Sequence, residues 1–589
     1  MIPAAPVPEA GYLAWRAAAV GRRKHEPVVR RRLTVALLAT FSTELLAELL
    51  PVAAARHGLA ADLRSVPFGQ LEQSLLDPAA PLRRSPPQYV VLAAAWPDLQ
   101  PPEMAAGARD PDEAVGAAVR RFTTLWRAAA ESGIRVVQLG TVPPAVDPYG
   151  EVAWTTPGSP SDLVRRVNAE LAGRAGDTVR YVDLDRVAAT KGLSAWEDTR
   201  YWYTARQPCA LDALPHLAAA IAGALAADAG LTRRCVVLDL DNTLWGGVLG
   251  DAGVDGVEVG EGARGEAYLA FQRYLRGLRD RGVALAVASK NDRDLALRAL
   301  DGNRHMALRT ADFAVVVADW RPKSEQLLEI AERLRLDLSA LVFVDDNPAE
   351  RAQVRAGLPA VEVVELPGQV SGYAAAVAAS PGLYAAPVTA ADLGRGSSYG
   401  GLAEAAALAE AAQSVPDFLS QLAMTATIVR VDEASLPRAA QLVAKTNQFN
   451  LTGRRRTRDE LAALLTAGGW RGWVLRLRDA FADHGVVGVA LATAEGEVAT
   501  IDTLILSCRV IGRTAERSLV AAVSRWARSN GCLRLVGLRR PSDRNAVTAE
   551  VYPGLGFTDM AGQPDHYEFD LRQGPVVPSA FIEEELADA

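Results

Sequence analysis

An apolar segment that ends in two closely spaced aspartates constrains this chain more than any other feature. The run Val237-Leu238 leads into Asp239 and Asp241, and Thr243 closes the turn that follows. Because residues i and i+2 of a strand point to the same side, both carboxylates can share one site at the C-terminal edge of a sheet. Two close carboxylates repel each other unless a cation neutralises them. The pattern therefore predicts a Mg²⁺ site and phosphate chemistry at the end of a buried strand.

Three later segments carry polar residues that the same sheet edge would bring together. Each lies at the end of an expected strand or the start of an expected helix, so all of them can converge on one crevice. They are Ser289, Lys290 and Asn291 after the expected strand 283–288, Lys323 at the start of the expected helix near 324–335, and Asp345 and Asp346 after the expected strand 341–344.

The chemistry of phosphoryl transfer suggests a role for each residue. Asp239 is the expected nucleophile on phosphorus, and Asp241 is the expected acid/base that protonates the leaving oxygen. Lys290 either supports the site or is simply exposed. The expected phosphate- or substrate-binding set is Thr243, Ser289, Lys290, Asn291 and Lys323, and the expected metal set is Asp239, Asp241, Asp345 and Asp346.

Composition narrows the classes of function. A chain of 589 residues should hold about three domains. Its net charge of −7 gives no reason to expect nucleic-acid binding, and no apolar run reaches the ~20 residues of a membrane span. The N-terminus has no basic region followed by an apolar core, and the four cysteines form no Cys-x-x-Cys pair. We therefore expect a cytoplasmic protein with reduced thiols and no membrane partner.

The order of strand-like and helical segments predicts the domains. Residues 1–230 and 231–380 both alternate apolar strands with helices, which indicates two α/β domains with parallel sheets. Residues 381–420 are rich in Ala, Gly and Ser and are expected to be a linker. Residues 421–575 mix strands and helices and indicate an α+β domain, followed by a tail at 576–589.

A cysteine in the last domain is a candidate nucleophile. Cys508 ends an expected strand, and Arg509 and Gly512 lie in the loop that opens the next helix. A cysteine beside arginines and a helix N-terminus can react as a thiolate. The alternative is a small buried hydrophobe. His484, before a strand of the same domain, is the candidate general base or a turn histidine without a role.

The phosphate-site residues also resemble a known family. The ordered set of Asp-x-Asp-x-Thr at 239–243, Ser289, Lys323 and the acidic pair 345–346 is similar to the haloacid-dehalogenase (HAD) superfamily. The extension through Trp245-Gly246-Gly247, together with the later Val-Asp-Asp-Asn-Pro, resembles its FkbH-like branch, over residues ~30–575. The resemblance implies an N-terminal SGNH-hydrolase-like domain, a central Rossmann-like HAD domain and a C-terminal GNAT-like domain.

This branch is associated with loading a glyceryl unit from 1,3-bisphosphoglycerate onto an acyl carrier protein (ACP) for polyketide-type antibiotic biosynthesis. The resemblance therefore implies Mg²⁺, an ACP partner with its phosphopantetheine arm, and a glyceryl thioester on Cys508. GNAT proteins bind CoA with an R/Q-x-x-G-x-G/A turn, which Arg509 and Gly512 match but Thr514 does not. Two other functions stay open: a Mg²⁺-dependent phosphatase fused to binding modules, and an acyl-CoA-dependent acyltransferase.

A polar segment near 445–456 could serve the same partner. Its amide and hydroxyl side chains could hydrogen-bond a glyceryl hydroxyl or a pantetheine amide, and its arginines suit the acidic surface of an ACP. Helix capping with a solvated charge run is an equally good explanation. The candidate substrate-binding residues are Asn447, Gln448, Asn450 and Thr452, with Arg509 from the later loop.

The first domain lacks the residues of an SGNH esterase. Ser42 follows the first strand without a Gly-Asp-Ser context, and Asp212 and His216 are four residues apart rather than three. We expect this domain to be non-catalytic.

Overall fold

The structure is a computed structural model, and it does not describe every residue. It describes residues 6–22, 30–64, 66–99, 110–176, 178–384, 408, 412–446, 448–466, 468–507, 510–542, 545–560 and 562–585, without the side chain of Lys445. These residues form two compact units, one within Met1–Thr232 and Ser380–Pro387, the other within Arg233–Ala379 and Val388–Ala589.

The first unit contains a parallel five-stranded sheet in the order β2-β1-β3-β4-β5. Its strands are β1 (Arg31–Ala39), β2 (Leu59–Arg64), β3 (Tyr89–Ala93), β4 (Arg135–Leu139) and β5 (Val179–Val182). Its longer helices are α1 (Gly11–Arg22), α2 (Glu44–Ala55), α5 (Pro111–Glu131), α6 (Pro160–Arg174), α7 (Leu184–Lys191) and α10 (Leu214–Asp228). Four shorter helices are α3 (Leu71–Leu76), α4 (Pro81–Arg84), α8 (Leu193–Trp196) and α9 (Thr199–Ala205).

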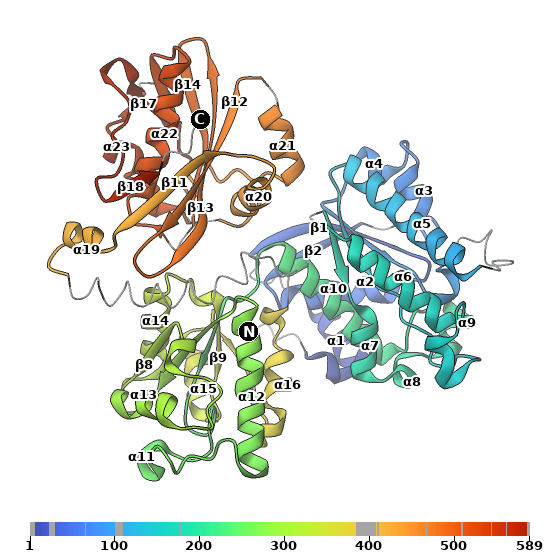
Figure 1. Cartoon of the computed structure of the whole chain (residues 1–589). Helices are drawn as coiled ribbons and strands as arrows, with labels where there is room; N and C mark the ends of the chain where they lie inside the picture. The colour runs from blue at the N-terminus through green and yellow to red at the C-terminus, as the bar shows by residue number, and fades with distance from the viewer. Residues whose placement is uncertain are drawn as a thin grey trace. The chain divides into compact units, whose positions relative to one another are not determined.

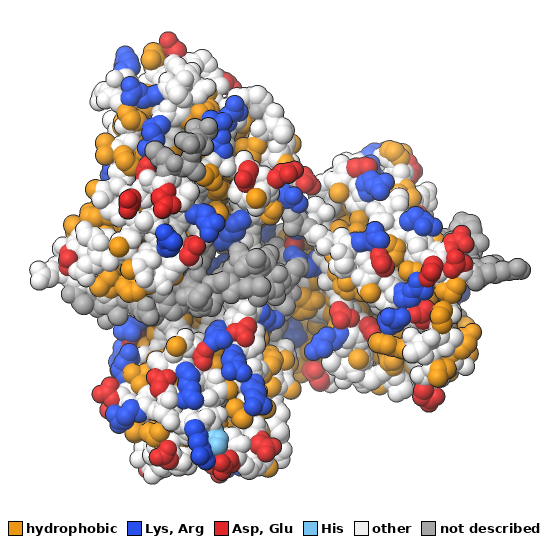
Figure 2. All heavy atoms as spheres, viewed as in Figure 1, with side chains coloured by type: hydrophobic (Ala, Val, Ile, Leu, Met, Phe, Trp, Pro, Cys, Tyr) orange, Lys and Arg blue, Asp and Glu red, His pale blue; other side chains and the backbone are white. Residues whose placement is uncertain are grey.

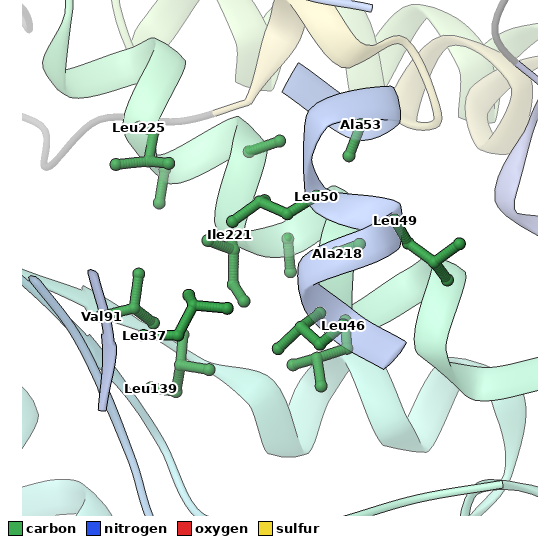
Figure 3. Close-up of a cluster of buried hydrophobic side chains, with 14 of the residues drawn as sticks. Leu37, Leu46, Leu49, Leu50, Ala53, Val91, Leu139, Ala218, Ile221 and Leu225 are labelled. Carbon is green, nitrogen blue, oxygen red and sulfur yellow. The ribbon is translucent and has the colours of Figure 1, made fainter. Parts of the chain in front are cut away.

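Helices cover both faces of this sheet because β1 is apolar on both sides. Leu33, Val35 and Leu37 belong to the hydrophobic cluster that includes α2 and α10. Ala36 and Leu38 belong to the cluster with α5 and α6 on the opposite face. Figure 3 shows side chains of α2 and α10 meeting those of the sheet.

The helix α10 is the apolar centre of the first unit. Within the described residues, Leu211–Asp228 is the one helical stretch long and apolar enough to cross a membrane by length and composition, and 72% of it is buried. Because this burial is against α2 and the sheet, it is a core helix. Tyr384, expected in the linker, also packs here, since a Cβ on Gly223 of α10 would meet its ring at 2.4 Å.

The central part of the chain, drawn in green and yellow in Figure 1, forms a second sheet. Its strands are all parallel and follow the order β10-β9-β6-β7-β8. Its strands are β6 (Cys235–Leu238), β7 (Ala284–Ser289), β8 (Val315–Ala318), β9 (Leu341–Val344) and β10 (Glu362–Val363). Its helices are α11 (Leu249–Ala252), α12 (Gly262–Asp280), α13 (Arg293–Gly302), α14 (Lys323–Arg333), α15 (Pro348–Gly357) and α16 (Tyr373–Ala378).

This strand order fixes where a ligand can bind. The chain passes from β6 outward to β7 and β8, then returns to the other side of β6 as β9. The order therefore reverses between β6 and β9, and open α/β sheets bind ligands at the carboxyl ends of the strands at such a point. The two expected parallel α/β sheets are confirmed, although the two-residue strand β10 was not foreseen.

The last part of the chain has an eight-stranded mixed sheet in the order β16-β17-β15-β14-β13-β12-β11-β18. Most neighbours are antiparallel, but β14 pairs in parallel with β15. The strands are β11 (Met424–Arg430), β12 (Trp470–Arg478), β13 (Asp483–Glu495), β14 (Val498–Leu506), β15 (Arg534–Leu538), β16 (Thr558–Asp559), β17 (His566–Asp570) and β18 (Ile582–Glu585). The helices are α19 (Val415–Gln421), α20 (Leu436–Lys445), α21 (Arg458–Thr466), α22 (Ala515–Ser529) and α23 (Val551–Gly554).

This sheet confirms the expected mixed α+β architecture and corrects the expected tail. Residues 576–589 were placed outside the domain, but β18 pairs in parallel with β11 at the sheet edge. Its sequence, Ile-Glu-Glu-Glu, has one apolar side chain, so the hydrophobic pattern could not reveal a strand. Its pairing comes from backbone hydrogen bonds, which composition does not encode.

The described surface mixes charged, polar and apolar side chains. On the face shown in Figure 2, hydrophobic side chains of the described residues are scattered among charged and polar ones. Single exposed apolar residues of this kind are normal for a globular surface and need no partner to cover them.

Candidate phosphate site

The ends of three neighbouring strands bring the predicted phosphate residues together. Asp239 follows β6 and continues its ladder, since its backbone N–H donates to Val344 O of β9 at 2.9 Å. Ser289 is the last residue of β7, and Asp345 follows β9 directly. Because β6 lies between β7 and β9, these side chains meet at the C-terminal edge of the sheet.

A polar cavity of about 330 Å³ opens at this edge. Its size is at the lower end for small-molecule sites, which suits a small ligand. Among the described residues that line it, Pro348 is the one apolar side chain. The lining residues are Asp239, Asp241, Asn242, Ser289, Lys290, Lys323, Asp346, Asn347, Pro348 and Glu350.

Lys323 is the buried cation of the cavity. Its side chain is only 2% exposed, and its Nζ lies 2.6 Å from Asp239 Oδ1 and 3.5 Å from Asp345 Oδ2. It also donates to the carbonyl oxygen of Ala288 at 2.6 Å. Lys323 begins α14 directly after Pro322, whose fixed φ suits a helix start, so the ammonium is held in one place. It can stabilise negative charge beside the expected nucleophile.

Asp239, Asp345 and Asp346 form a group that fits a divalent cation. One carboxylate oxygen from each lies within 4.8 Å of the others. Burial and the charge of Asp239 raise the pKa of Asp345 to about 7, and the same two causes raise the pKa of Asp346. Asp345 Oδ2 is buried and accepts no hydrogen bond from a described group. Hard carboxylate oxygens that repel one another are the ligand set Mg²⁺ prefers, so these residues fit that ion.

Asp241 was expected among the metal ligands, but its carboxylate is outside this group. Its Oδ1 accepts hydrogen bonds from the indole Nε1 of Trp245 at 2.9 Å and from the backbone N–H of Leu249 at 3.0 Å. Its Oδ2 accepts from Asn291 Nδ2 at 3.0 Å. The sequence could not anticipate this, because the donors come from the segment after Asp241 and from the loop after β7. Asp241 still lines the cavity, where a substrate oxygen could reach it.

The loop after Asp241 needs both of its glycines. A Cβ on Gly246 would meet Glu258 Oε2 at 2.5 Å and the Tyr268 ring at 2.9 Å. Gly247 has a φ of 93°, a conformation that side chains rarely adopt. The Trp-Gly-Gly sequence thus folds back tightly, and buried Trp245 reaches Asp241.

Two residues of the expected phosphate-binding set support other side chains instead. Thr243 is fully buried, and its Oγ1 accepts the backbone N–H of Asp346 at 3.1 Å. Asn291 bridges Asp241 and Ser289, because its Nδ2 also lies 3.1 Å from Ser289 Oγ. Neither is among the cavity-lining residues, so both act on the orientation of groups that are.

Lys290 lines the cavity and is paired with a residue that the sequence did not single out. Its Nζ lies 2.6 Å from Glu350 Oε1 in the first turn of α15. The Lys290 side chain is 37% exposed, in contrast to Lys323. Lys290 thus lies at the cavity wall and is partly exposed, and its role in phosphate or substrate binding stays a prediction.

The predicted residues of the C-terminal domain are only partly described. Asn447, Cys508 and Arg509 lie outside the described residues. The roles expected for them, including the Cys508 thioester, stay predictions.

His484 was expected in a turn, but it lies within β13, and its side chain is fully buried. Its Nε2 lies 2.8 Å from Asp479 Oδ2, and Arg513 contacts both. Burial alone would raise the pKa of Asp479, but the hydrogen bond from His484 and the charge of Arg513 lower it to about 2. His484 Nδ1 is buried without a described partner, so it is the ring nitrogen left for any further contact.

Asn450 and Thr452 satisfy the chain's own backbone rather than facing solvent. Asn450 Oδ1 accepts the N–H of Gly453 at 2.9 Å, and Thr452 Oγ1 donates to Asp502 O at 3.1 Å. Both side chains are buried, so their contacts do not support the expectation that they bind substrate. Gln448 is exposed, and its expected role in substrate binding stays a prediction. The nearby arginines Arg454 and Arg456 both pair with buried Asp502.

The N-terminal domain does not assemble an esterase site from its expected positions. Ser42 Oγ donates to Glu44, and Asp212 Oδ1 accepts the backbone N–H of Tyr12 at 2.8 Å. Burial lowers the pKa of His216. Ser42 and Asp212 thus make local hydrogen bonds, and the expectation of a non-catalytic domain stays a prediction.

The chain is similar to a solved structure, the N-terminal part of protein BF1531 from Bacteroides fragilis, described as containing a phosphatase domain complexed with Mg. It is 28% identical, covers 64% of this chain and 98% of that chain, and has a TM-score of 0.57.

A family model matches the N-terminal part of the chain. Residues 34–226 match the model described as the FkbH N-terminal domain.

Two acetyltransferase structures are also similar over a quarter of the chain or less. A putative GNAT-family acetyltransferase from Desulfovibrio desulfuricans is 17% identical, covers 25% of this chain and 99% of that chain, and has a TM-score of 0.21. The Escherichia coli ribosomal-protein-S18-alanine N-acetyltransferase is 15% identical, covers 24% of this chain and 91% of that chain, and has a TM-score of 0.20. No match was found among curated proteins.

Proposed function

We propose that this chain is a Mg²⁺-dependent enzyme that converts 1,3-bisphosphoglycerate to a glyceryl thioester and loads it onto an ACP. The observation that carries the proposal is that one chain joins an FkbH N-terminal domain to a cavity with the residues of phosphoryl transfer. The expected thiol nucleophile, Cys508, belongs to the same chain. A cytoplasmic location is part of this proposal, supported by four cysteines that form no Cys-x-x-Cys pair, as expected for reduced thiols.

Removal of the phosphate at carbon 3 follows from the cavity. Asp239 attacks phosphorus, the bond from phosphorus to the glyceryl oxygen breaks, and water later hydrolyses the phospho-aspartate. Lys323, beside Asp239, and Ser289 stabilise the phosphoryl oxygens. Asp241 gives the leaving oxygen a proton. For this step it must exchange one of its three present donors for the substrate oxygen.

Asp239, Asp345 and Asp346 would hold the metal. A bound Mg²⁺ would neutralise these carboxylates and polarise the phosphoryl group. Lys323 pairs with two of these three carboxylates, and one ammonium cannot neutralise three negative charges. The site therefore needs further positive charge before an anionic substrate can enter.

Acyl transfer involves the other end of the substrate. The Cys508 thiolate attacks the acyl carbon, the bond to the carbon-1 phosphate breaks, and inorganic phosphate leaves. The ACP thiol then takes the glyceryl group in a second exchange that returns the Cys508 thiolate. Each step conserves charge without a redox partner.

Intact-mass spectrometry of an ACP tests this function. The ACP is incubated with enzyme, Mg²⁺ and 1,3-bisphosphoglycerate, and the expected result is an increase by one glyceryl group. Asp239→Asn should stop removal of the carbon-3 phosphate, and Cys508→Ala should stop loading. Normal loading by Cys508→Ala would refute the thioester role.

A second candidate, a plain phosphatase fused to binding modules, is favoured by the likeness to BF1531. It predicts phosphate release without any ACP and no effect of losing Cys508. The acyl-CoA-dependent acyltransferase is the third candidate, and measured CoA affinity separates it from the other two.

A further inference from the structure

The cavity contains a second cation that phosphoryl transfer itself does not use. The chain has five lysines, and two of them, Lys290 and Lys323, line this one cavity. Lys323 is committed to Asp239, Asp345 and a backbone oxygen. No other cation is found among the described residues of the cavity lining. A second negative group on a substrate would therefore find its counter-charge at Lys290.

The two lysines lie at different depths. Lys323 is almost fully buried beside the expected nucleophile, whereas over a third of the Lys290 side chain is exposed. A phosphoryl group placed between Asp239 and Lys323 would therefore leave Lys290 to the outer part of the same small molecule. The cavity volume of about 330 Å³ suits a short molecule with charges at both ends.

The Lys290 ammonium is paired with the Glu350 carboxylate. The ion pair is 2.6 Å long, and the other carboxylate oxygen, Oε2, is buried without a described donor. One contact to a partly exposed ammonium contributes little to stability, so a substrate anion can replace it. Glu350 also lies in the first turn of α15, where the helix dipole favours a negative charge even without Lys290.

We infer that Lys290 recognises a second anionic group of a small phosphorylated substrate, displacing Glu350, and so selects substrates that carry a carboxylate or a second phosphate. This inference rests on the phosphate site of the proposed function and adds a residue that selects the substrate. It also implies that the phosphate is removed while the far end of the free substrate is still negatively charged, before that end becomes an uncharged thioester.

Phosphate release from three small substrates tests the inference with the full chain and Mg²⁺. Glycerol 3-phosphate has no second anion, 3-phosphoglycerate has a carboxylate, and propane-1,3-diol bisphosphate has a second phosphate. The wild type should prefer the last two in kcat/KM. Lys290→Met should reduce that preference by about 10- to 100-fold, the equivalent of one charge-assisted hydrogen bond. Glu350→Gln should increase it, because the competing carboxylate is gone.

A matched control and a binding measurement complete the design. Lys191→Met, in the first unit, should leave the preference as it is in the wild type. Calorimetry with the phosphonate analogues of the three substrates gives the same comparison without turnover. If Lys290→Met weakens only the carboxylate substrate, the second group is a carboxylate; if only the bisphosphate, it is a phosphate.

Equal affinities of the wild type for all three analogues, or an equal loss for all three in Lys290→Met, would overturn the inference. Failure of the proposed function has a different signature. In that case the preference for the dianionic substrates persists, but the ACP gains no glyceryl group.

Discussion

Replacing the buried lysine of the cavity should destabilise the protein far more than replacing its exposed neighbour. In Lys323→Met, the carboxylates of Asp239 and Asp345 lose the cation that pairs with both of them, whose side chain is 2% exposed. Breaking a buried ion pair costs about 3–5 kcal/mol, whereas an exposed pair contributes about 0–1 kcal/mol. Lys290→Met, which removes the partly exposed pair with Glu350, is therefore the matched control.

The cost should depend on pH with a definite sign. Burial and Asp239 raise the pKa of Asp345 from 3.8 to about 7, and Lys323 opposes that rise. A carboxyl group with a raised folded-state pKa lowers the stability of the fold as pH rises from about 4 to 7, because the unfolded state has then released the proton that the folded state still holds. Without Lys323 the pKa of Asp345 rises further. The loss in Lys323→Met should thus be greater at pH 8 than at pH 5.5.

Thermal unfolding of the full chain in the presence of a chelator measures both effects. We expect the transition that contains the central domain to fall by about 10 °C at pH 8 for Lys323→Met. For Lys290→Met the fall should be about 2 °C or less. The reasoning is refuted if both variants lose the same amount, or if the loss in Lys323→Met is as large at pH 5.5 as at pH 8.

Three further predictions concern other parts of the molecule. In the first unit, Asp228→Asn should lower the free energy of unfolding by about 3 kcal/mol, because it leaves Arg135 at its 2.6 Å ion pair without a carboxylate. Burial alone would raise the pKa of Asp228, but Arg135 lowers it to about 2, so this contribution should be present above pH 4 and disappear as pH falls towards 2 in acid-unfolding curves. Asn291→Ala should reduce kcat for phosphate release by about 10- to 100-fold with a smaller change in KM, since it frees both Asp241 and Ser289; an unchanged kcat would exclude this positioning role. Chelation should abolish phosphate release and added Mg²⁺ should restore it, and activity that survives chelation would contradict the proposed metal dependence.

The sequence was sufficient to locate the phosphate site because strand ends are predictable. Apolar runs such as Cys235–Leu238 and Leu341–Val344 are buried on both faces, so the residue after each must emerge at the sheet edge. Asp239 and Asp345 are such residues. Ser289 is the last residue of β7, which pairs with β6 on the side opposite β9. Their convergence follows from strand geometry alone.

Contacts between side chains of the site could not be read in the same way. Asp241 has the same sequence spacing as a second metal ligand, yet the Trp245 indole and Asn291 hold its carboxylate elsewhere. Thr243 looks like a phosphate ligand but is buried under Asp346. A side chain of two or three rotatable bonds can face several partners, and only the packed structure selects one.

The last domain shows the same division. Asn450 and Thr452 are polar in sequence, but the structure uses both to satisfy backbone groups near β14. The strand β18 was unforeseen because Ile-Glu-Glu-Glu carries almost no hydrophobic signal.

By itself, the sequence determined the α/β and α+β architecture and the set of charged residues at the ends of the central strands, because hydrophobic periodicity and strand ends are local properties. Only the tertiary structure decided how those charges are shared. Lys323 is buried between carboxylates and Lys290 is held by Glu350, because the depth and the partners of each lysine depend on helices α14 and α15 folding back onto the same sheet edge.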